Sequence, residues 1–496
     1  MSISSIGSQS SSAIQTLVQM RAQLNELQRQ MSTGLKSDTY AGLGLGRGLS
    51  IGLRAQISAV NAYSDTITSV GTRISIAQTA LQRVGAIGNA TRSTILQANA
   101  AGTSAGTLQA TARTSLDELI GLLNTQSGDR YLFSGRDTDT PAVASITDIL
   151  DGQGARAGLK QIISERQQAD LGTAGTGRLT ITAPTATSVS IGDEASPFGI
   201  KLSSVSSTLS NVATGLGGTP STLTVDFTGV PNDGETLTLR VTLPDGSTEN
   251  ITMTATTKSP PGDGQFTIGA SDADTAANFQ SALTSTIEKF AKTSLTAASA
   301  VQASNEFFNA DVNNPPLRVD GPPFDSATGL VSGTAANTVV WYTGDAATDS
   351  ARGTATAQID RSLSVNYGVR ANEEGIRDIV KSVATLAAVS INPTSANAAD
   401  LGAALNRRLT GTLSNNDGGQ TVMDIQAELA GAQTSMAAAK GRHQQTEATV
   451  GDFLQQIAGV TNEEVAAQIL ALQTRMEASM QTTAMLFQTS LVNYLR

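Results

Sequence analysis

The chain has no cysteine and only one histidine among its 496 residues. The absence of cysteine excludes disulfides, thiolate metal sites and a cysteine nucleophile. The single histidine, His443, excludes zinc fingers and HExxH zinc sites, and any Ser-His-Asp triad would depend on it alone. His443 lies next to Lys440 and Arg442 in a helical pattern, and we expect it on the surface. These absences remove most classes of enzyme.

Charged residues are scarce as well, at 15% of the chain. The 32 Lys and Arg residues stand against 42 Asp and Glu residues, which gives a net charge of −10 without any basic block. We therefore predict no binding to nucleic acid or to anionic membranes. Residues 478–495 carry no charge, but they contain Gln481, Thr482 and Asn493. A membrane-spanning helix needs about 20 mainly apolar residues, so we predict a packing helix and no membrane insertion.

Proline is missing from both ends, since all 13 prolines lie between Pro141 and Pro393. Proline breaks helix interiors, so long helices are predicted before and after this stretch. In the middle, apolar residues alternate along 222–228 and 236–243, as in half-buried strands. The sequence therefore predicts an α+β multidomain fold with long terminal α-helices and a β-rich centre.

The two terminal helices carry apolar stripes. The first stripe has the 3-4-3-4 spacing of a heptad seam, which indicates a coiled-coil partner. The second follows a capping box at Thr461 and Glu464. The residues assigned to subunit packing are Leu17, Met20, Leu24, Leu27, Met31, Leu472, Met476, Phe487 and Leu491. Two interpretations stay open: an ordinary intramolecular core, or terminal helices that pack together and against neighbouring copies.

A search for reactive groups gives no catalytic, cofactor-binding or metal site. The glycines of AGLGLGRG (41–48) fit neither GxGxxG nor a Walker motif, and they lie between two predicted helices, so a hinge is expected. Acid pairs such as Glu373-Glu374 are adjacent and point about 100° apart on a helix, so they form no dyad. The aspartates of the centre lack calcium-loop spacing.

The ends of the chain resemble a known family. The helix, then Ser-Thr-Gly-Leu-Lys (32–36), then a long helix containing Ile74 to Leu81, is similar to the N-terminal region of bacterial flagellins. The final LALQTRMEASMQTTAMLFQTSLVNYLR resembles the matching C-terminal helix. The resemblance covers about residues 1–140 and 340–496, and it leaves the middle uncovered.

A second resemblance points to the hook-associated branch of this family, whose junction protein joins hook to filament. The stretch GDRYLFSG and the Thr and Pro that follow resemble that branch's signature, and WYTGD resembles the return into the domain. The residues that carry it are Gly128, Tyr131, Phe133, Gly135, Pro141, Trp341, Gly344 and Asp345. Filament flagellins share part of this pattern, so the branch stays open.

The resemblance implies paired terminal helices in an inner coiled-coil domain (1–40 with 460–496). It implies a helical, rod-like second domain with β elements (41–199 with 311–459), and a small α/β outer domain is expected at 200–310. It further implies a non-enzymatic, extracellular subunit that passes through the flagellar type III export apparatus with the help of a chaperone. Its partners would be copies of itself, hook-associated proteins and flagellin. The alternatives are the main filament flagellin and, more remotely, a secreted enzyme or carbohydrate-binding module.

Overall fold

A computed structural model describes the backbone of residues 3–101, 105–414 and 418–494. Within these ranges, the side chains of residues 3–10, 99–101, 105 and 486–494 are outside the description. The chain forms two compact units. Unit 1 contains Met1–Val70, Ala357–Val365 and Thr434–Arg496, and unit 2 contains Gly71–Thr356 and Asn366–Gln433. The three-domain division expected from the sequence, with boundaries near 40, 200, 310 and 460, stays a prediction.

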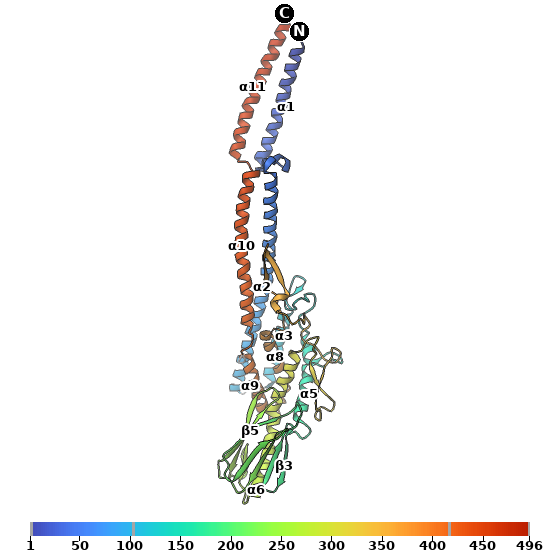
Figure 1. The fold of residues 1–496 in the computed structure, drawn as a ribbon, viewed down its shortest axis with the longest axis vertical. Coiled ribbons are helices and arrows are strands. Elements are labelled where there is room, and N and C mark those ends of the chain that lie inside the picture. The colour runs from blue at the N-terminus through green and yellow to red at the C-terminus, as the bar shows by residue number, and fades with distance from the viewer. Residues whose placement is uncertain (1–2, 102–104, 415–417, 495–496) are drawn as a thin grey trace. The chain divides into compact units, whose positions relative to one another are not determined.

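Long helices occupy both ends of the chain, so the predicted α+β fold with long terminal helices is confirmed. The elements that contribute residues to unit 1 are α1 (Ile3–Thr33), η1 (Tyr40–Gly46), α2 (Arg47–Ala101), β13 (Thr356–Asp360), β14 (Leu363–Asn366), α10 (Val422–Ala458) and α11 (Asn462–Tyr494). Helices α1 and α11 pack side by side within this unit (Figure 1). Strands β13 and β14 form a two-stranded ribbon.

The ends of the long helices follow from local sequence. Helix α1 stops at Gly34, whose φ of +67° lies in the left-handed region that favours glycine at a helix C-terminus. Helix α11 starts after Thr461, whose Oγ1 accepts a hydrogen bond from the Glu464 amide at 3.3 Å. The capping residue Thr461 is as the sequence predicts.

Unit 2 combines short helices with the β-rich part of the chain. Its remaining helical elements are α3 (Ala105–Leu123), α4 (Ile146–Asp151), α5 (Leu159–Leu171), α6 (Asp272–Phe290), the π-helical turn η2 (Ala291–Leu295), α7 (Thr296–Phe308), η3 (Ala351–Thr354), α8 (Glu374–Ala388) and α9 (Ala398–Leu413). Its strands are β1 (Gln126–Ser127), β2 (Arg130–Tyr131), β3 (Thr180–Thr185), β4 (Ser188–Gly192), β5 (Lys201–Ser207), β6 (Val212–Gly217), β7 (Thr222–Phe227), β8 (Thr236–Thr242), β9 (Thr248–Thr256), β10 (Gln265–Thr267), β11 (Leu317–Val319) and β12 (Leu330–Ser332).

Two four-stranded sheets share one hydrophobic core with helix α6. Their strand orders are β10-β9-β8-β5 and β3-β4-β7-β6, and β8 and β9 form an antiparallel hairpin. The side chains of Phe227, Phe266 and Phe279 are buried together, with ring centroids 5.2 to 6.4 Å apart. Because β3 and β4 belong to one of these sheets, the strands begin upstream of residue 200.

Candidate assembly surface

In unit 1, the family-like segment 32–36 ties the end of α1 to the end of α10. The Lys36 amide donates to the Ala458 carbonyl at 2.8 Å, and the Val460 amide donates to the Gly34 carbonyl at 3.0 Å. The Lys36 ammonium also donates to the carbonyls of Gln456 and Ile457, both at 3.2 Å. These are terminal carbonyls of α10, where a helix lacks internal donors and a positive charge is favourable.

Most of the predicted packing residues are partly covered along the pair of helices α1 and α11. Leu17, Met20, Leu24 and Leu27 are half-buried on α1, as is Met476 on α11. The two exceptions among the described side chains are Leu472, which is buried, and Met31, which is exposed. The other predicted packing residues, Phe487 and Leu491, lie in α11, but their side chains are outside the described part of the chain. Packing of α1 against α11 within one chain therefore already covers part of the seam.

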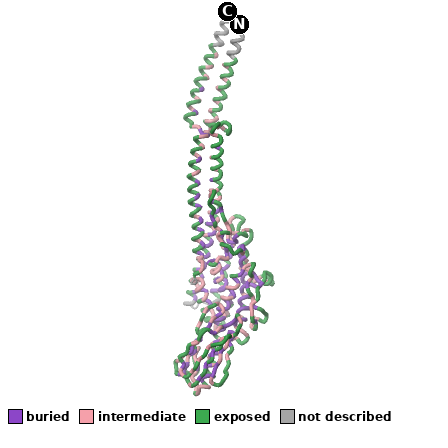
Figure 2. Tube along the Cα trace, in the orientation of Figure 1, coloured by how far each residue is buried: buried purple, intermediate pink, exposed green. Residues whose placement is uncertain are grey.

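A second set of apolar side chains on the same helices is mostly exposed in the monomer. Its members are at least 49% exposed: Ile14 and Val18 on α1, and Leu470 and Met480 on α11. Figure 2 shows the described parts of both helices as mostly exposed or intermediate. The packing residues predicted from the sequence include none of these four. The signal for Ile14 and Val18 was their i, i+4 spacing on a second face.

The two helices leave a groove of about 590 Å³ between them. Its lining residues are Ala22, Gln23, Glu26, Leu27, Gln468, Ala471, Leu472 and Arg475. Small alanine side chains on both walls keep the groove open, and long polar side chains edge it. An elongated helix pair whose groove mixes apolar and polar side chains suits another helix more than a small molecule.

In unit 2, the structure brings together the two family-motif segments. The Asp345 amide donates to the Ser134 carbonyl and the Thr343 amide donates to the Ala142 carbonyl, both at 2.9 Å. These bonds join segment 134–142 to segment 343–345 across more than 200 residues of intervening chain, as the Arg136–Asp345 separation of 209 shows. The two motif segments therefore meet where the chain enters and leaves the long insertion between them.

The aromatic motif residues differ in burial. Phe133 and Trp341 are fully buried, and the Trp341 Nε1–H donates to the Phe308 carbonyl at 2.9 Å. Tyr131 is half-buried in β2, and Pro141 is exposed. The buried pair Phe133 and Trp341 holds the two segments in the core.

The three motif glycines have distinct reasons to be glycine. Gly128 has φ +64° with open space around it, so only its backbone conformation matters. Gly135 has φ +68°, and a Cβ there would lie 2.9 Å from the Cβ of Asp345. At Gly344, a Cβ would lie 2.7 Å from the Ser134 carbonyl oxygen, so the closeness of the two segments requires glycine.

Ion pairs also connect the two motif segments. The Asp345 carboxylate accepts from Arg370 at 2.9 Å and from Arg136 at 3.0 Å. Burial opposes ionisation of Asp345, but the Ala347 amide and these guanidinium groups outweigh it and lower its pKa. Hydrogen bonds from Arg136 and Arg370 hold the pKa of Asp349 well below its usual range. Sequence reasoning missed both arginines, and Arg370 carries no local signal.

His443 corrects a prediction. Its side chain is only 4% exposed, its Nε2 lies 2.7 Å from the Ile359 carbonyl oxygen, and its ring stacks on Tyr63. The surface position expected from the neighbouring Lys440 and Arg442 is wrong. Ile359 lies in strand β13, which contacts this face of α10. The residues around His443 in the sequence do not predict that contact.

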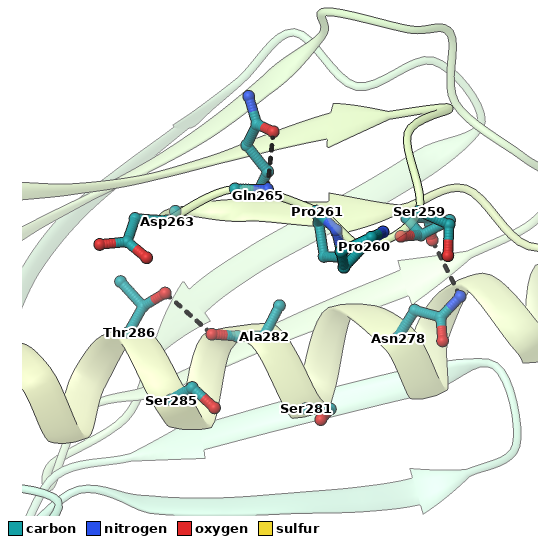
Figure 3. A pocket seen from close by; sticks show the side chains of 13 residues that line it. Ser259, Pro260, Pro261, Asp263, Gln265, Asn278, Ser281, Ala282, Ser285 and Thr286 are labelled. Carbon is teal, nitrogen blue, oxygen red and sulfur yellow. Dashed lines mark hydrogen bonds between the residues drawn. The ribbon is translucent and has the colours of Figure 1, made fainter.

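The β-rich part of unit 2 contains a polar groove of about 580 Å³ (Figure 3). It runs between loop 259–265 and the face of α6 that carries Asn278, Ser281 and Ser285. Its carboxylate Asp263 is bound by Lys289 at 2.8 Å, which lowers the pKa of Asp263. Among the described residues that line the groove, none is a histidine or a second acid, so the paired groups that acid–base catalysis needs are not brought together there.

Among the described residues, no group of three or more His, Asp or Glu side chains is placed to hold a metal ion. Nor does any described helix combine the length and apolar character required to cross a bilayer.

Comparison with known proteins indicates the class. Residues 5–138, from α1 through the first motif segment, match the family description "Bacterial flagellin N-terminal helical region". The match supports the bacterial flagellin family and a structural subunit of the flagellum, which agrees with the resemblance of 32–36 and 74–81. Flagellins are structural proteins that assemble with copies of themselves outside the cell and are not enzymes. No curated protein matches the chain.

Proposed function

We propose that the protein is a structural subunit of the bacterial flagellum that joins hook to filament and assembles through its terminal helices. The observation that carries the assembly mechanism is the exposed apolar set on α1 and α11: Ile14, Val18, Leu470 and Met480. A helix pair with such a surface gains stability when neighbouring copies cover it.

The magnitudes favour cooperation among several of these residues. Burying one Leu, Val, Ile or Met side chain contributes about 1.5–3 kcal/mol. Association costs about 4–15 kcal/mol in lost freedom of motion, so one such contact cannot hold a neighbour. Contacts between different faces of neighbouring copies allow open helical growth when the rotation from copy to copy does not close a ring.

The assignment to the junction rests on the motif residues. The segment that contains Phe133 and Gly135 bonds to the WYTGD return segment through Ser134, and this arrangement is where the chain resembles the hook-associated branch. In this proposal the partners are copies of the chain, other hook-associated proteins and flagellin. Export proceeds through the flagellar type III apparatus, with a chaperone covering α1 and α11 beforehand.

The second candidate is the main filament flagellin, which the matched N-terminal region favours equally. An antibody against residues 200–310 tests the two on isolated flagella by immunogold electron microscopy. A narrow band where hook meets filament supports the junction protein. Label along the whole filament supports the filament flagellin and contradicts the junction protein. No label on any flagellum contradicts both candidates.

The assembly mechanism has its own test. Leu470→Asp places a charge on a side chain that is 65% exposed, so the monomer should fold normally and fail to assemble. Val230→Asp is the matched control, because Val230 is 40% exposed in the β-rich part of unit 2. Pelleting of assembled protein is the measurement, and normal pelleting of Leu470→Asp would contradict the mechanism.

A further inference from the structure

Two arginines converge on a small cleft in unit 2. The cleft, of about 40 Å³, lies between α2, β2 and the chain after β14. Arg73 and Ile74 line it from α2, Arg130 and Tyr131 from β2, and Tyr367 from the third segment. We call it the arginine cleft.

The two guanidinium groups of the arginine cleft have no carboxylate partner within the part of the chain that the structure describes. Arg73 is half-buried, and it makes a long contact of 3.5 Å to the Tyr367 hydroxyl. Arg130 is exposed at the other side of the cleft. The nearby Arg352 differs, because it binds both Glu373 and Glu428.

The arginine cleft carries positive charge in an acidic chain. With 42 Asp and Glu residues against 32 Lys and Arg residues, carboxylates outnumber cations. Each guanidinium presents five N–H donors, and a partly desolvated one is costly without an acceptor. The cleft therefore presents donors and positive charge, with no carboxylate among the described residues that line it.

The chemistry of the cleft favours one kind of occupant. Its volume of about 40 Å³ suits the head group of a single side chain. Arginine binds carboxylates with paired, charge-assisted hydrogen bonds. A large polyanion is further disfavoured by the net charge of −10. A single Asp or Glu side chain fits these conditions.

We propose that the arginine cleft binds an Asp or Glu side chain of a second copy of this chain. The inference rests on the proposed function, because that function brings copies together at high local concentration. The contact then orients unit 2 of neighbouring copies, while the terminal helices supply most of the burial.

The first experiment measures the critical concentration for assembly by pelleting, over a range of salt concentrations. The variant Arg73→Gln/Arg130→Gln should raise the critical concentration about tenfold at low salt, with a weaker salt dependence than the wild type. The control Arg240→Gln/Lys258→Gln removes the same charge from exposed positions in the β-rich part and should assemble like the wild type.

The second experiment identifies the contact. Arg130→Lys keeps the charge and places an amine at the cleft, so a carbodiimide should couple that amine to the neighbour's carboxylate in assembled protein. Mixing ¹⁵N-labelled and unlabelled chains then gives a hybrid cross-linked peptide, which Arg130→Gln cannot form.

The outcomes separate the two proposals. If the wild type assembles while the Gln pair assembles equally well and no hybrid peptide forms, the cleft contact is wrong and the assembly function stands. If the wild type never assembles, the proposed function is wrong and the contact fails with it.

Discussion

Arg408 binds Asp245 at 2.8 Å, although 163 residues separate them in the chain. The guanidinium of Arg408, from α9, also donates to Glu249 on β9 at 2.7 Å. The side chains of Arg408 and Asp245 are 8% and 5% exposed. This buried pair fastens the turn of the β8–β9 hairpin to a helix that returns from beyond the insertion.

Removing that arginine should destabilise unit 2. Arg408→Ala leaves two acidic groups without their shared cation, which costs about 3–5 kcal/mol when a pair is buried. Arg407→Ala is the matched control, since Arg407 is 65% exposed and 3.9 Å from Glu249, and it should change stability by less than about 0.5 kcal/mol. Denaturant unfolding measures both. Equal stabilities for the two variants would show that the buried contact is energetically unimportant.

The closeness of the motif segments gives a second prediction. Gly135→Ala should cost about 1–2 kcal/mol for the left-handed backbone and about 1–3 kcal/mol more for the contact with Asp345. Gly128→Ala, with a similar φ and open space, should cost only the first amount. Thermal unfolding of both variants makes the comparison. If the Gly128 variant is as unstable as the Gly135 variant, the contact with Asp345 does not explain the cost at Gly135.

The charges at the motif junction predict a pH dependence. The pKa values of Asp345 and Asp349 are lowered in the folded state, so their stabilisation is fully present above the unfolded value of about 3.9. It is lost as the pH falls from that value through the lower pKa values of the folded state. Asp345→Asn/Asp349→Asn should therefore be less stable at pH 7 and lose less stability between about pH 4 and pH 2.

Denaturant unfolding at several pH values tests this dependence. Asp117→Asn, at an exposed position of α3, serves as the control with an unchanged pH profile. A double variant with the wild-type profile would mean that other acids cause the acid sensitivity.

Lys36 gives a prediction for unit 1. Lys36→Met removes the ammonium that caps the last carbonyls of α10, which should destabilise this join by about 0.3–1 kcal/mol. Amide hydrogen exchange is the sensitive measurement, because the Lys36 and Val460 amides both donate across the join. Both should exchange faster in Lys36→Met, and not in Lys440→Met, which changes an exposed lysine on α10. Unchanged exchange at both amides would show that the backbone hydrogen bonds alone connect segment 34–36 to the end of α10.

Much of the fold could be predicted because its signals are local. The missing prolines predict where long helices run, and the capping Thr461 predicts where the last one begins. The alternation along 222–228 and 236–243 predicts β7 and β8. The long-range pairings were hidden, such as β3 and β4 joining the sheet of β7.

The assembly surface was predicted only in part, because only its local signals can be seen in the sequence. Heptad spacing located the seam at Leu17 to Leu27, but spacing within one helix does not reveal which faces a partner covers. The i, i+4 spacing of Ile14 and Val18 shows that they share a face, and the packed helices show that this face is exposed. His443 failed as a surface residue because Tyr63 and Ile359 reach it from distant parts of the chain.

The sequence by itself determined the helical ends, the β-rich centre, the absence of thiol chemistry and the resemblance to flagellins, because these depend on composition and near neighbours. The tertiary structure alone decided which charges are paired. Asp345 meets Arg370, and Arg408 meets Asp245, because folding brings distant segments within hydrogen-bonding distance. The same folding places Arg73 and Arg130 at one cleft without an acid among its described lining residues, and an electrostatic partner cannot be assigned until distances are fixed.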